Sequence, residues 1–245
     1  MHIEFLHFDT LLGKYNNNSV YDCSFVLSNP IRNIQNIYLK SLEIPISFNN
    51  IRASNSTNTF QITVLTSTYT ITIDENNYTS ITTLLNDINT KLHLVLPNIT
   101  FGLNMKNKVI ITLSGYPNDT TILFNKSRLL NIILGFTSLS YINNITAENN
   151  YLLAYDNYIS MFIQDIPVKS SSFTTQLISF KIPLNAVNGV VYYLQELNSF
   201  SQSVEFTYKN YVLSNLRIVI FDRFGIQLTN GLDYSFSLAV SYYDQ

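Results

Sequence analysis

Residues 234–242 read Tyr-Ser-Phe-Ser-Leu-Ala-Val-Ser-Tyr, and this stretch decides the fold. Large apolar side chains stand at every second position and alternate with Ser or Ala. Successive side chains of a β-strand point to opposite faces, so a period of two over nine residues predicts a sheet strand with one face in the core. The small side chains on the other face leave room for a neighbouring strand layer or a neighbouring subunit.

The same alternation recurs upstream of this stretch. In residues 216–221 Leu and Ile alternate with Arg, Val and Phe, which predicts another strand. Residues 60–64 and 69–73 form two alternating runs with a short Thr/Ser turn between them, which predicts a β-hairpin with one apolar face. Residues 109–113 predict one more short strand.

Two segments follow the period of a helix instead. In residues 79–92 the apolar residues recur at intervals of three and four, which places them on one face of an α-helix that Asn77 or Thr79 would cap. The members of this stripe are Ile81, Leu84, Leu85, Ile88 and Leu92.

The second helical segment is residues 126–134. Asn125 or Ser127 precedes its apolar residues and would cap its start, and Gly135 can end it.

Outside residues 50–150, strand signals fall in eight stretches: 20–28, 36–48, 156–165, 176–183, 190–196, 203–209, 215–223 and 233–243. Eight is the number of strands in a jelly roll. We therefore predict an all-β fold, a single eight-stranded jelly roll with an inserted β-plus-helix subdomain. Residues 1–49 would form an N-terminal arm and the first two strands, residues 50–150 the insertion, and residues 151–245 the remainder. The rival layout is two sequential β domains divided near residue 150.

The composition favours a protein that buries part of its surface against other subunits. Charged residues make up 12% of the 245 residues and hydrophobic residues 46%, whereas a typical soluble domain carries about 25% charged residues. The chain holds 17 Tyr and 16 Phe, which fill sheet cores and subunit contacts. The net charge of -2 and the sparse lysines argue against nucleic-acid binding.

The sequence also predicts a cellular compartment. Cys23 is the single cysteine, so no internal disulfide forms, and its apolar strand context predicts a buried small side chain. The first residues lack the pattern of a signal peptide, and no run of about 18 apolar residues predicts a membrane span. We therefore expect synthesis and assembly in the cytoplasm.

The motifs of common enzyme and metal sites are missing from the sequence. There is no GxSxG, HExxH or P-loop motif, and seven glycines are too few for a phosphate-binding loop. His2 and His7 would lie on opposite faces of one strand, and His93 ends a predicted helix, so none joins a metal-ligand cluster. We predict no catalytic residue, no cofactor-binding residue, no metal ligand and no cofactor.

Two acidic segments are better explained by local structure than by chemistry. Asp74 and Glu75 precede a predicted helix, where negative charge is favourable. Asp222-Arg223-Phe224-Gly225 follows an apolar strand, and Asp at the first and Gly at the fourth position suit a type I turn.

Several stretches resemble one family when they are taken in order. Residues 216–225 with 230–238 look like the closing hairpin of penton and minor capsid proteins, the single jelly-roll proteins of large eukaryotic DNA viruses and virophages. Residues 37–45 resemble an early strand of these proteins. Residues 76–79 resemble the segment that enters their helix, and residues 134–136 resemble the end of a second helix. Residues 151–163 resemble the strand where their jelly roll resumes.

This resemblance implies a jelly-roll fold and a structural role in the virion capsid, and it implies no catalytic residues. We expect a penton protein that forms homopentamers at five-fold vertices and contacts the neighbouring major capsid protein, without nucleic acid and without a membrane span. One alternative is a minor capsid or cement protein between capsomers. Another is a host-attachment module that binds glycans, centred on the inserted subdomain. An enzyme on a β scaffold has no motif to support it.

Overall fold

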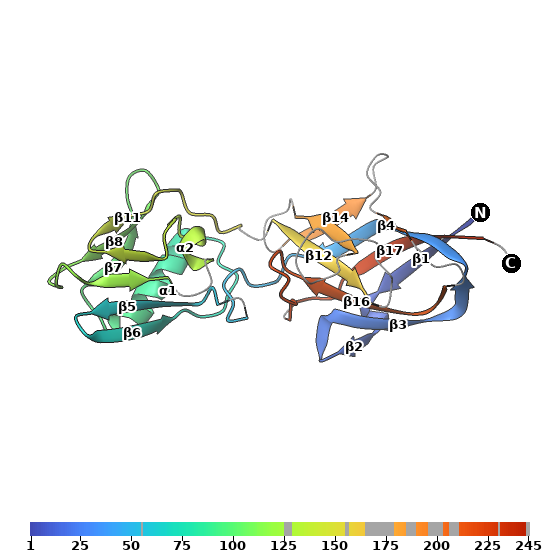
Figure 1. Cartoon of the computed structure of the whole chain (residues 1–245), viewed down its shortest axis with the longest axis horizontal. Helices are drawn as coiled ribbons and strands as arrows, with labels where there is room; N and C mark the ends of the chain where they lie inside the picture. Colours follow the sequence, from blue (N-terminus) through green and yellow to red (C-terminus); the bar gives the residue numbers. More distant parts are fainter. Residues whose placement is uncertain are drawn as a thin grey trace. The chain divides into compact units, whose positions relative to one another are not determined.

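The computed structural model divides the chain into two compact units (Figure 1). Unit 1 comprises Met1–Phe48 and Asp156–Gln245, and unit 2 comprises Asn49–Tyr155. The structure describes residues 1–54, 56–124, 129–154, 157–164, 179–184, 190–195, 203–205, 211–229 and 231–243.

Unit 1 consists of two antiparallel sheets. One sheet has the order β1-β17-β4-β14, with β15 also paired to β4, and the other has the order β13-β12-β16-β3-β2. A short 3-10 helix, η1 (Thr10–Leu12), follows the first strand. The strands are β1 (His2–Asp9), β2 (Lys14–Asn16), β3 (Ser19–Arg32), β4 (Ile34–Pro45), β12 (Tyr158–Ile163), β13 (Phe180–Pro183), β14 (Val191–Gln195), β15 (Ser203–Glu205), β16 (Val212–Phe221) and β17 (Ser235–Tyr242).

The core of unit 1 lies between the two sheets. Phe236 of β17 stacks on Phe8 of β1, with ring centroids 4.9 Å apart, and Phe25 of β3 meets Phe8 at the same distance. Leu238 and Val240 are buried in the same cluster. The alternation in residues 234–242 therefore predicted the core face of β17 correctly, because burying these large side chains is the dominant favourable contribution to folding.

Each of the eight stretches predicted outside residues 50–150 contains a strand, and the chain is of the all-β class with antiparallel sheets. The predicted residues 156, 165, 176–178, 196 and 206–209 lie outside the described part of the chain. Among the described residues outside 50–150, the structure adds two strands that the sequence analysis missed, β1 and β2. Residues 2–9, expected to be part of an arm, pair along their whole length with β17.

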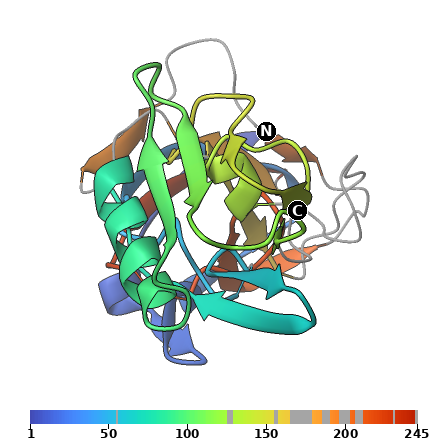
Figure 2. The same cartoon turned by 90° about the vertical axis from the view of Figure 1, so that its left-hand side faces the viewer.

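Unit 2 combines short strands with two helices. Its sheets have the orders β10-β9-β5-β6 and β11-β8-β7, and α1 packs beside β6 and β7 (Figure 2). The elements are β5 (Thr59–Val64), β6 (Ser67–Thr72), α1 (Ile81–His93), β7 (Ile99–Leu103), β8 (Val109–Leu113), β9 (Thr121–Leu123), α2 (Leu130–Ile133), β10 (Ser140–Ile142) and β11 (Ile145–Thr146). The predicted hairpin is confirmed as β5 and β6, and the predicted strand 109–113 is β8.

Helix α1 buries the predicted stripe, since all five of its apolar members are buried. The predicted cap is wrong, however. Ser80, rather than Asn77 or Thr79, caps the helix: its Oγ accepts a hydrogen bond of 3.2 Å from the backbone N–H of Thr82. The helix begins only at Ile81, so Ser80 is the residue with extended backbone next to the first free N–H groups.

Helix α2 is shorter than predicted among the described residues and covers Leu130–Ile133. Gly135 ends it, as expected, in a left-handed conformation with φ of 89°. Its missing side chain is also needed for space, because a Cβ there would lie 2.3 Å from the backbone oxygen of Asn149. The proposed caps Asn125 and Ser127 lie outside the described residues.

Candidate interaction surface

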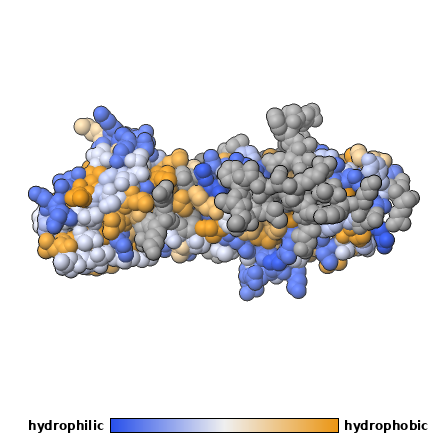
Figure 3. All heavy atoms as spheres, viewed as in Figure 1, coloured by the Kyte–Doolittle hydropathy of each residue, from blue (hydrophilic) through white to orange (hydrophobic). Residues whose placement is uncertain are grey.

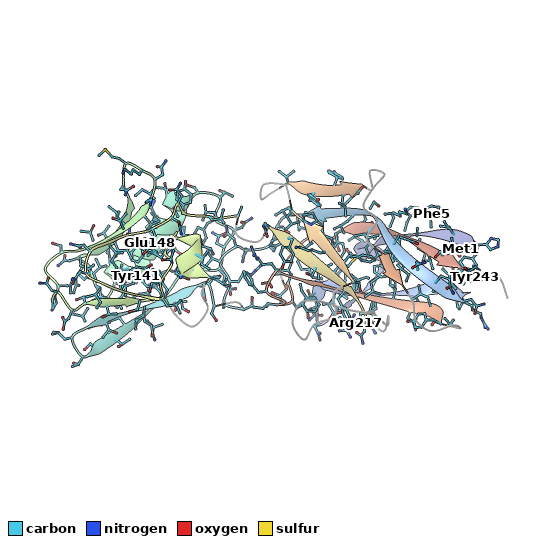
Figure 4. The ribbon with its side chains drawn as sticks, turned by 45° about the horizontal axis from the view of Figure 1, so that its top comes forward. Met1, Phe5, Tyr141, Glu148, Arg217 and Tyr243 are labelled. Carbon is cyan, nitrogen blue, oxygen red and sulfur yellow. The ribbon has the colours of Figure 1, made fainter. Side chains whose placement is uncertain are left out.

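The first strand of unit 1 carries apolar side chains on its solvent side. Strand β1 ends its sheet, with β17 as its one strand partner among the described residues. Phe8 points into the core, whereas Ile3 and Phe5 point the other way and are 54% and 60% exposed. Met1 is also exposed and lies near Phe5 (Figure 4). We call Met1, Ile3 and Phe5 the β1 strip.

Strand β17 turns its small side chains to the same face as the β1 strip. Ala239 lies opposite Phe5 and Ser241 opposite Ile3 in the sheet register. Both are buried even though they point away from the core. The Ser237 hydroxyl accepts a hydrogen bond of 2.9 Å from the hydroxyl of Ser41 on β4. It shares a second hydrogen bond, of 2.7 Å, with Nδ1 of His7. Strand β17 therefore presents small side chains to this face, whereas the neighbouring β4 adds the exposed carboxylate of Glu43.

Strand β14 forms the other edge of this sheet. Tyr192 is buried against the core, so Val191 and Tyr193 point to the same outer face as the β1 strip. Tyr193 is 67% exposed. We call Val191 and Tyr193 the β14 strip. Exposed apolar residues that gather along an edge, rather than standing singly, mark interaction sites.

The surface of unit 2 mixes polar and apolar residues. Figure 3 shows white, pale and orange residues over much of this unit, with strong blue in a few places. Its exposed apolar residues, including Leu65, Leu94 and Met105, sit in turns and loops rather than along one strand. Unit 2 therefore offers no continuous apolar strip among its described strands.

A partly buried ion pair holds the second sheet of unit 1. Arg217 of β16 donates hydrogen bonds from Nε and Nη2 to the two carboxylate oxygens of Asp22 on β3, each 2.7 Å long. Its Nη1 donates to Gln164 over 2.7 Å. The bonds from Arg217 hold the pKa of Asp22 below its ordinary value, although burial opposes this, and the amide of Asn16 donates a further bond. The guanidinium of Arg217 and the amide of Asn16 both donate to the Asp22 carboxylate within the fold, so the ion pair is structural.

A second polar cluster ties the start of β17 to the N-terminal segment. Asp233 accepts hydrogen bonds from the hydroxyls of Thr10 and Tyr15, and Thr10 in turn accepts from the backbone N–H of Tyr234 over 3.0 Å. The bond to Asp233, with some desolvation, raises the pKa of Tyr15 to about 12. This cluster fixes the η1 turn against the edge where β1 and β17 meet.

A hydrogen-bonded cluster in unit 2 is centred on the carboxylate of Glu148. Glu148 accepts from the hydroxyl of Tyr141 at 3.0 Å and from the backbone N–H of Thr137 at 3.0 Å (Figure 4). Burial alone would raise the pKa of Glu148, but hydrogen bonds from its own backbone N–H, from Thr137 and from Tyr141 outweigh it and leave the pKa below its ordinary value. The tyrosine hydroxyl also accepts from the backbone N–H of Ser138, so the cluster organises a loop.

The histidines are not brought together. His2 and His7 lie on opposite faces of β1, as predicted, and His2 lies beside the ring of Tyr242. His93 is the last residue of α1, and its Nε2 lies 3.0 Å from the backbone oxygen of Ile99. Across the described ranges, no three His, Cys, Asp or Glu side chains form a group that could hold a metal ion.

Two other predicted assignments are confirmed. Cys23 is fully buried, as expected for a small core residue. Asp222 begins a turn in which its backbone oxygen accepts from the N–H of Gly225 at 3.1 Å and its side chain accepts from Phe224 at 2.8 Å. None of the helices within the described residues has the length and apolarity needed to cross a bilayer.

Comparisons with known proteins place the fold. No protein-family model matches the sequence, and no curated protein matches it. Among solved structures, the chain is similar to the mavirus penton protein, with 11% identity, a TM-score of 0.51, and coverage of 99% of this chain and 100% of that chain. A structure of the Sputnik virophage matches with 11% identity and a TM-score of 0.45 over 97% of this chain and 98% of that chain. The chain therefore shares the fold of the mavirus penton protein.

Proposed function

We propose that this chain is a structural virion protein, a penton protein that forms pentamers at the five-fold vertices of a capsid. The observation that carries the proposal is the fold likeness to the mavirus penton protein, which runs over nearly the whole of both chains and therefore includes both units. The proposal gives the chain a place in the virion capsid and a neighbouring major capsid protein as a partner, with assembly in the host cytoplasm.

The strand orders support a jelly roll as the finer description of unit 1. Taking β1, β3, β4, β12, β13, β14, β16 and β17 as strands one to eight, the first pairs with the eighth, the second with the seventh, the third with the sixth and the fourth with the fifth. A long hairpin wrapped into two layers, as in a jelly roll, gives these pairings. In this proposal β1 replaces β15 among the eight strands.

On the same description, unit 2 is an insertion between the third and fourth strands, because its residues 49–155 fall between β4 and β12. The insertion contributes its own helices and sheets to a chain whose jelly-roll domain is built from the segments on either side. Its role in the capsid would be to extend or reinforce the vertex.

The surface supports a role in assembly rather than in catalysis. The outer face of the β1-β17-β4-β14 sheet combines exposed apolar edges with a row of small side chains. Interfaces are enriched in aromatic residues and depleted of charge at their centres. The carboxylates described above are paired within the fold and serve local structure, so we propose a protein without enzymatic activity.

The mass of the purified chain in solution tests the proposal. Size-exclusion chromatography with light scattering is expected to give a species near five times 28.1 kDa, since a five-fold vertex needs a closed ring of five copies. A chain that stays at 28.1 kDa up to millimolar concentration, and also in the presence of the major capsid protein, would overturn the pentamer.

The alternatives give different results in the same set of experiments. A cement protein would remain a monomer alone and become ordered only on assembled capsomers. A glycan-binding module would bind a sugar array and lose that binding when exposed tyrosines such as Tyr193 are changed to alanine.

A further inference from the structure

Two apolar strips lie at opposite edges of one sheet and on one face of it. The sheet order β1-β17-β4-β14 puts the β1 strip at one end and the β14 strip at the other. Both strips point away from the core, because their neighbours in the strands, Phe8 and Tyr192, are the residues that enter it. The sheet therefore has an apolar side chain row at each lateral edge.

The two strips differ in sequence and shape. The β1 strip is aliphatic with one phenyl ring, and the β14 strip is a valine followed by a tyrosine. An interface between different patches is heterologous, and successive heterologous contacts close into a ring when the rotation between copies permits it. A two-fold dimer, by contrast, would place a strip against its own copy.

We infer that the β1 strip of one copy packs against the β14 strip of the next copy, so that a second copy of this chain is the occupant of each edge. The inference rests on the proposed function, because it assigns the contact that the ring of five would use. The structural observations behind it are the apolar side chains at both edges of the same sheet and their position on a common face.

The chemistry of the contact favours this pairing. The five side chains of the two strips are uncharged. The exposed carboxylate of Glu43 stands beside Tyr193 in the sheet register and accepts a hydrogen bond from Ser235, so this ion has a partner within the fold. Phe5 and Tyr193, 60% and 67% exposed, are the large aromatic side chains of the two strips. Aromatic residues contribute most to interface stability, and the Tyr193 hydroxyl can stay hydrated at the rim while the ring is buried.

The strand edges also permit the approach. Among the described residues, β1 is paired with β17 alone and β14 with β4 alone. An edge strand presents backbone groups that another chain can approach. Within the described part of the chain, no further strand of the same sheet covers either edge.

Cross-linking of engineered cysteines tests the inference directly. The native Cys23 is fully buried, and burial raises the pKa of its thiol to about 11, so it stays unreactive toward a maleimide at neutral pH. Phe5→Cys and Tyr193→Cys are made as separate variants, mixed, reassembled and treated with a short bis-maleimide. The expected product is a dimer containing one copy of each variant.

The control is each variant alone. Heterologous packing predicts little cross-linking in either single variant, because each contact then contains one cysteine. The double variant, with both cysteines in one chain, is expected to give a ladder that ends at five copies. Strong cross-linking of Phe5→Cys alone would overturn the inference, because it would mean that the β1 strips meet each other.

Loss of assembly provides a second readout. Phe5→Ser and Tyr193→Ser are each expected to weaken the pentamer at least tenfold in its dissociation midpoint. Val26→Ser is the matched control, since Val26 is 82% exposed on the other sheet and is expected to leave the midpoint unchanged. Circular dichroism verifies that all three variants fold.

The outcomes separate the contact from the proposed function. A species of five copies that forms unchanged in Phe5→Ser and Tyr193→Ser, with no mixed cross-link, overturns the edge contact and leaves the pentamer standing. A chain that never exceeds one copy overturns the pentamer and the contact together.

Discussion

Arg217 on β16 and Asp22 on β3 meet diagonally across two paired strands, because Arg217 stands opposite Ser24 and Asp22 stands opposite Val219. Two hydrogen bonds of 2.7 Å join the guanidinium to both carboxylate oxygens. Asp22 is 1% exposed and Arg217 is 37% exposed, so the charge of the carboxylate depends on this contact. A planar guanidinium is suited to this bidentate geometry, and a lysine is not.

Asp22→Asn is expected to lower the free energy of unfolding by about 2 to 3 kcal/mol. Removing one partner of a fully buried pair costs about 3 to 5 kcal/mol, and the partial exposure of Arg217 reduces the loss. Urea denaturation at neutral pH measures it. The control is Asp119→Asn, an exposed carboxylate in unit 2, for which we expect less than about 0.5 kcal/mol. Equal losses in the two variants would contradict the structural role of the pair.

The same pair gives the stability a pH dependence. The hydrogen bonds that Arg217 donates to Asp22 lower the pKa of this carboxyl in the folded chain below the ordinary value of 3.8. Its contribution is therefore complete above pH 3.8 and is lost as the pH falls through the lowered folded pKa. Urea denaturation between pH 7 and pH 2 is expected to show a steeper acid loss in the wild type than in Asp22→Asn. Parallel curves would show that Asp22 is not the responsible group.

Gly231→Ala is expected to destabilise unit 1 by about 1 to 3 kcal/mol, the usual cost of overpacking a core. A Cβ at this position would lie 2.0 Å from the hydroxyl oxygen and 2.2 Å from Cζ of Tyr21, which is fully buried, so the ring would have to shift. Thermal unfolding followed by circular dichroism measures the change. Gly102→Ala is the control, because its Cβ would meet Ile110 at an ordinary 3.7 Å. A Gly231→Ala variant as stable as Gly102→Ala would contradict the close approach.

The two cores can be probed by one leucine in each. Leu84 of α1 and Leu238 of β17 are both fully buried, the first in the core of unit 2 and the second in that of unit 1. Leu84→Ala and Leu238→Ala are each expected to cost about 2 to 5 kcal/mol. Hydrogen exchange is expected to show the first loss of protection in the unit that carries the substitution. Loss of protection that begins in the other unit would contradict the assignment of one separate hydrophobic core to each unit.

Much of the fold was predictable because its signals are local. Strand β17, the β5–β6 hairpin and the apolar stripe of α1 all follow from the spacing of large side chains along a short segment. Strand β1 was missed for the opposite reason. Ile3 and Phe5 face outward while Leu6 and Phe8 face inward, so apolar residues stand on both faces and hide the period of two.

The interaction surface and the buried pair were not predictable because both depend on distant residues. Asp22 and Arg217 are 195 positions apart and meet only through the pairing of β3 with β16. A lone acid between Tyr21 and Cys23 was the available signal, since a charge in an apolar strand needs a partner. The β1 and β14 strips become one arrangement only when the sheet order is known.

The pairing of β1 with β17 has a consequence for the timing of synthesis. Strand β1 leaves the ribosome long before its partner is made, whereas unit 2 is a continuous segment whose contacts are complete once residue 155 has emerged. Strand β17 starts at Ser235, 226 positions after β1 ends at Asp9. At about 5 to 20 residues per second, β1 therefore waits for roughly 11 to 45 seconds with its apolar side chains uncovered. The nascent chain thus carries an unpaired, aggregation-prone edge during translation, and a chaperone that holds the first strand would raise the yield of folded protein.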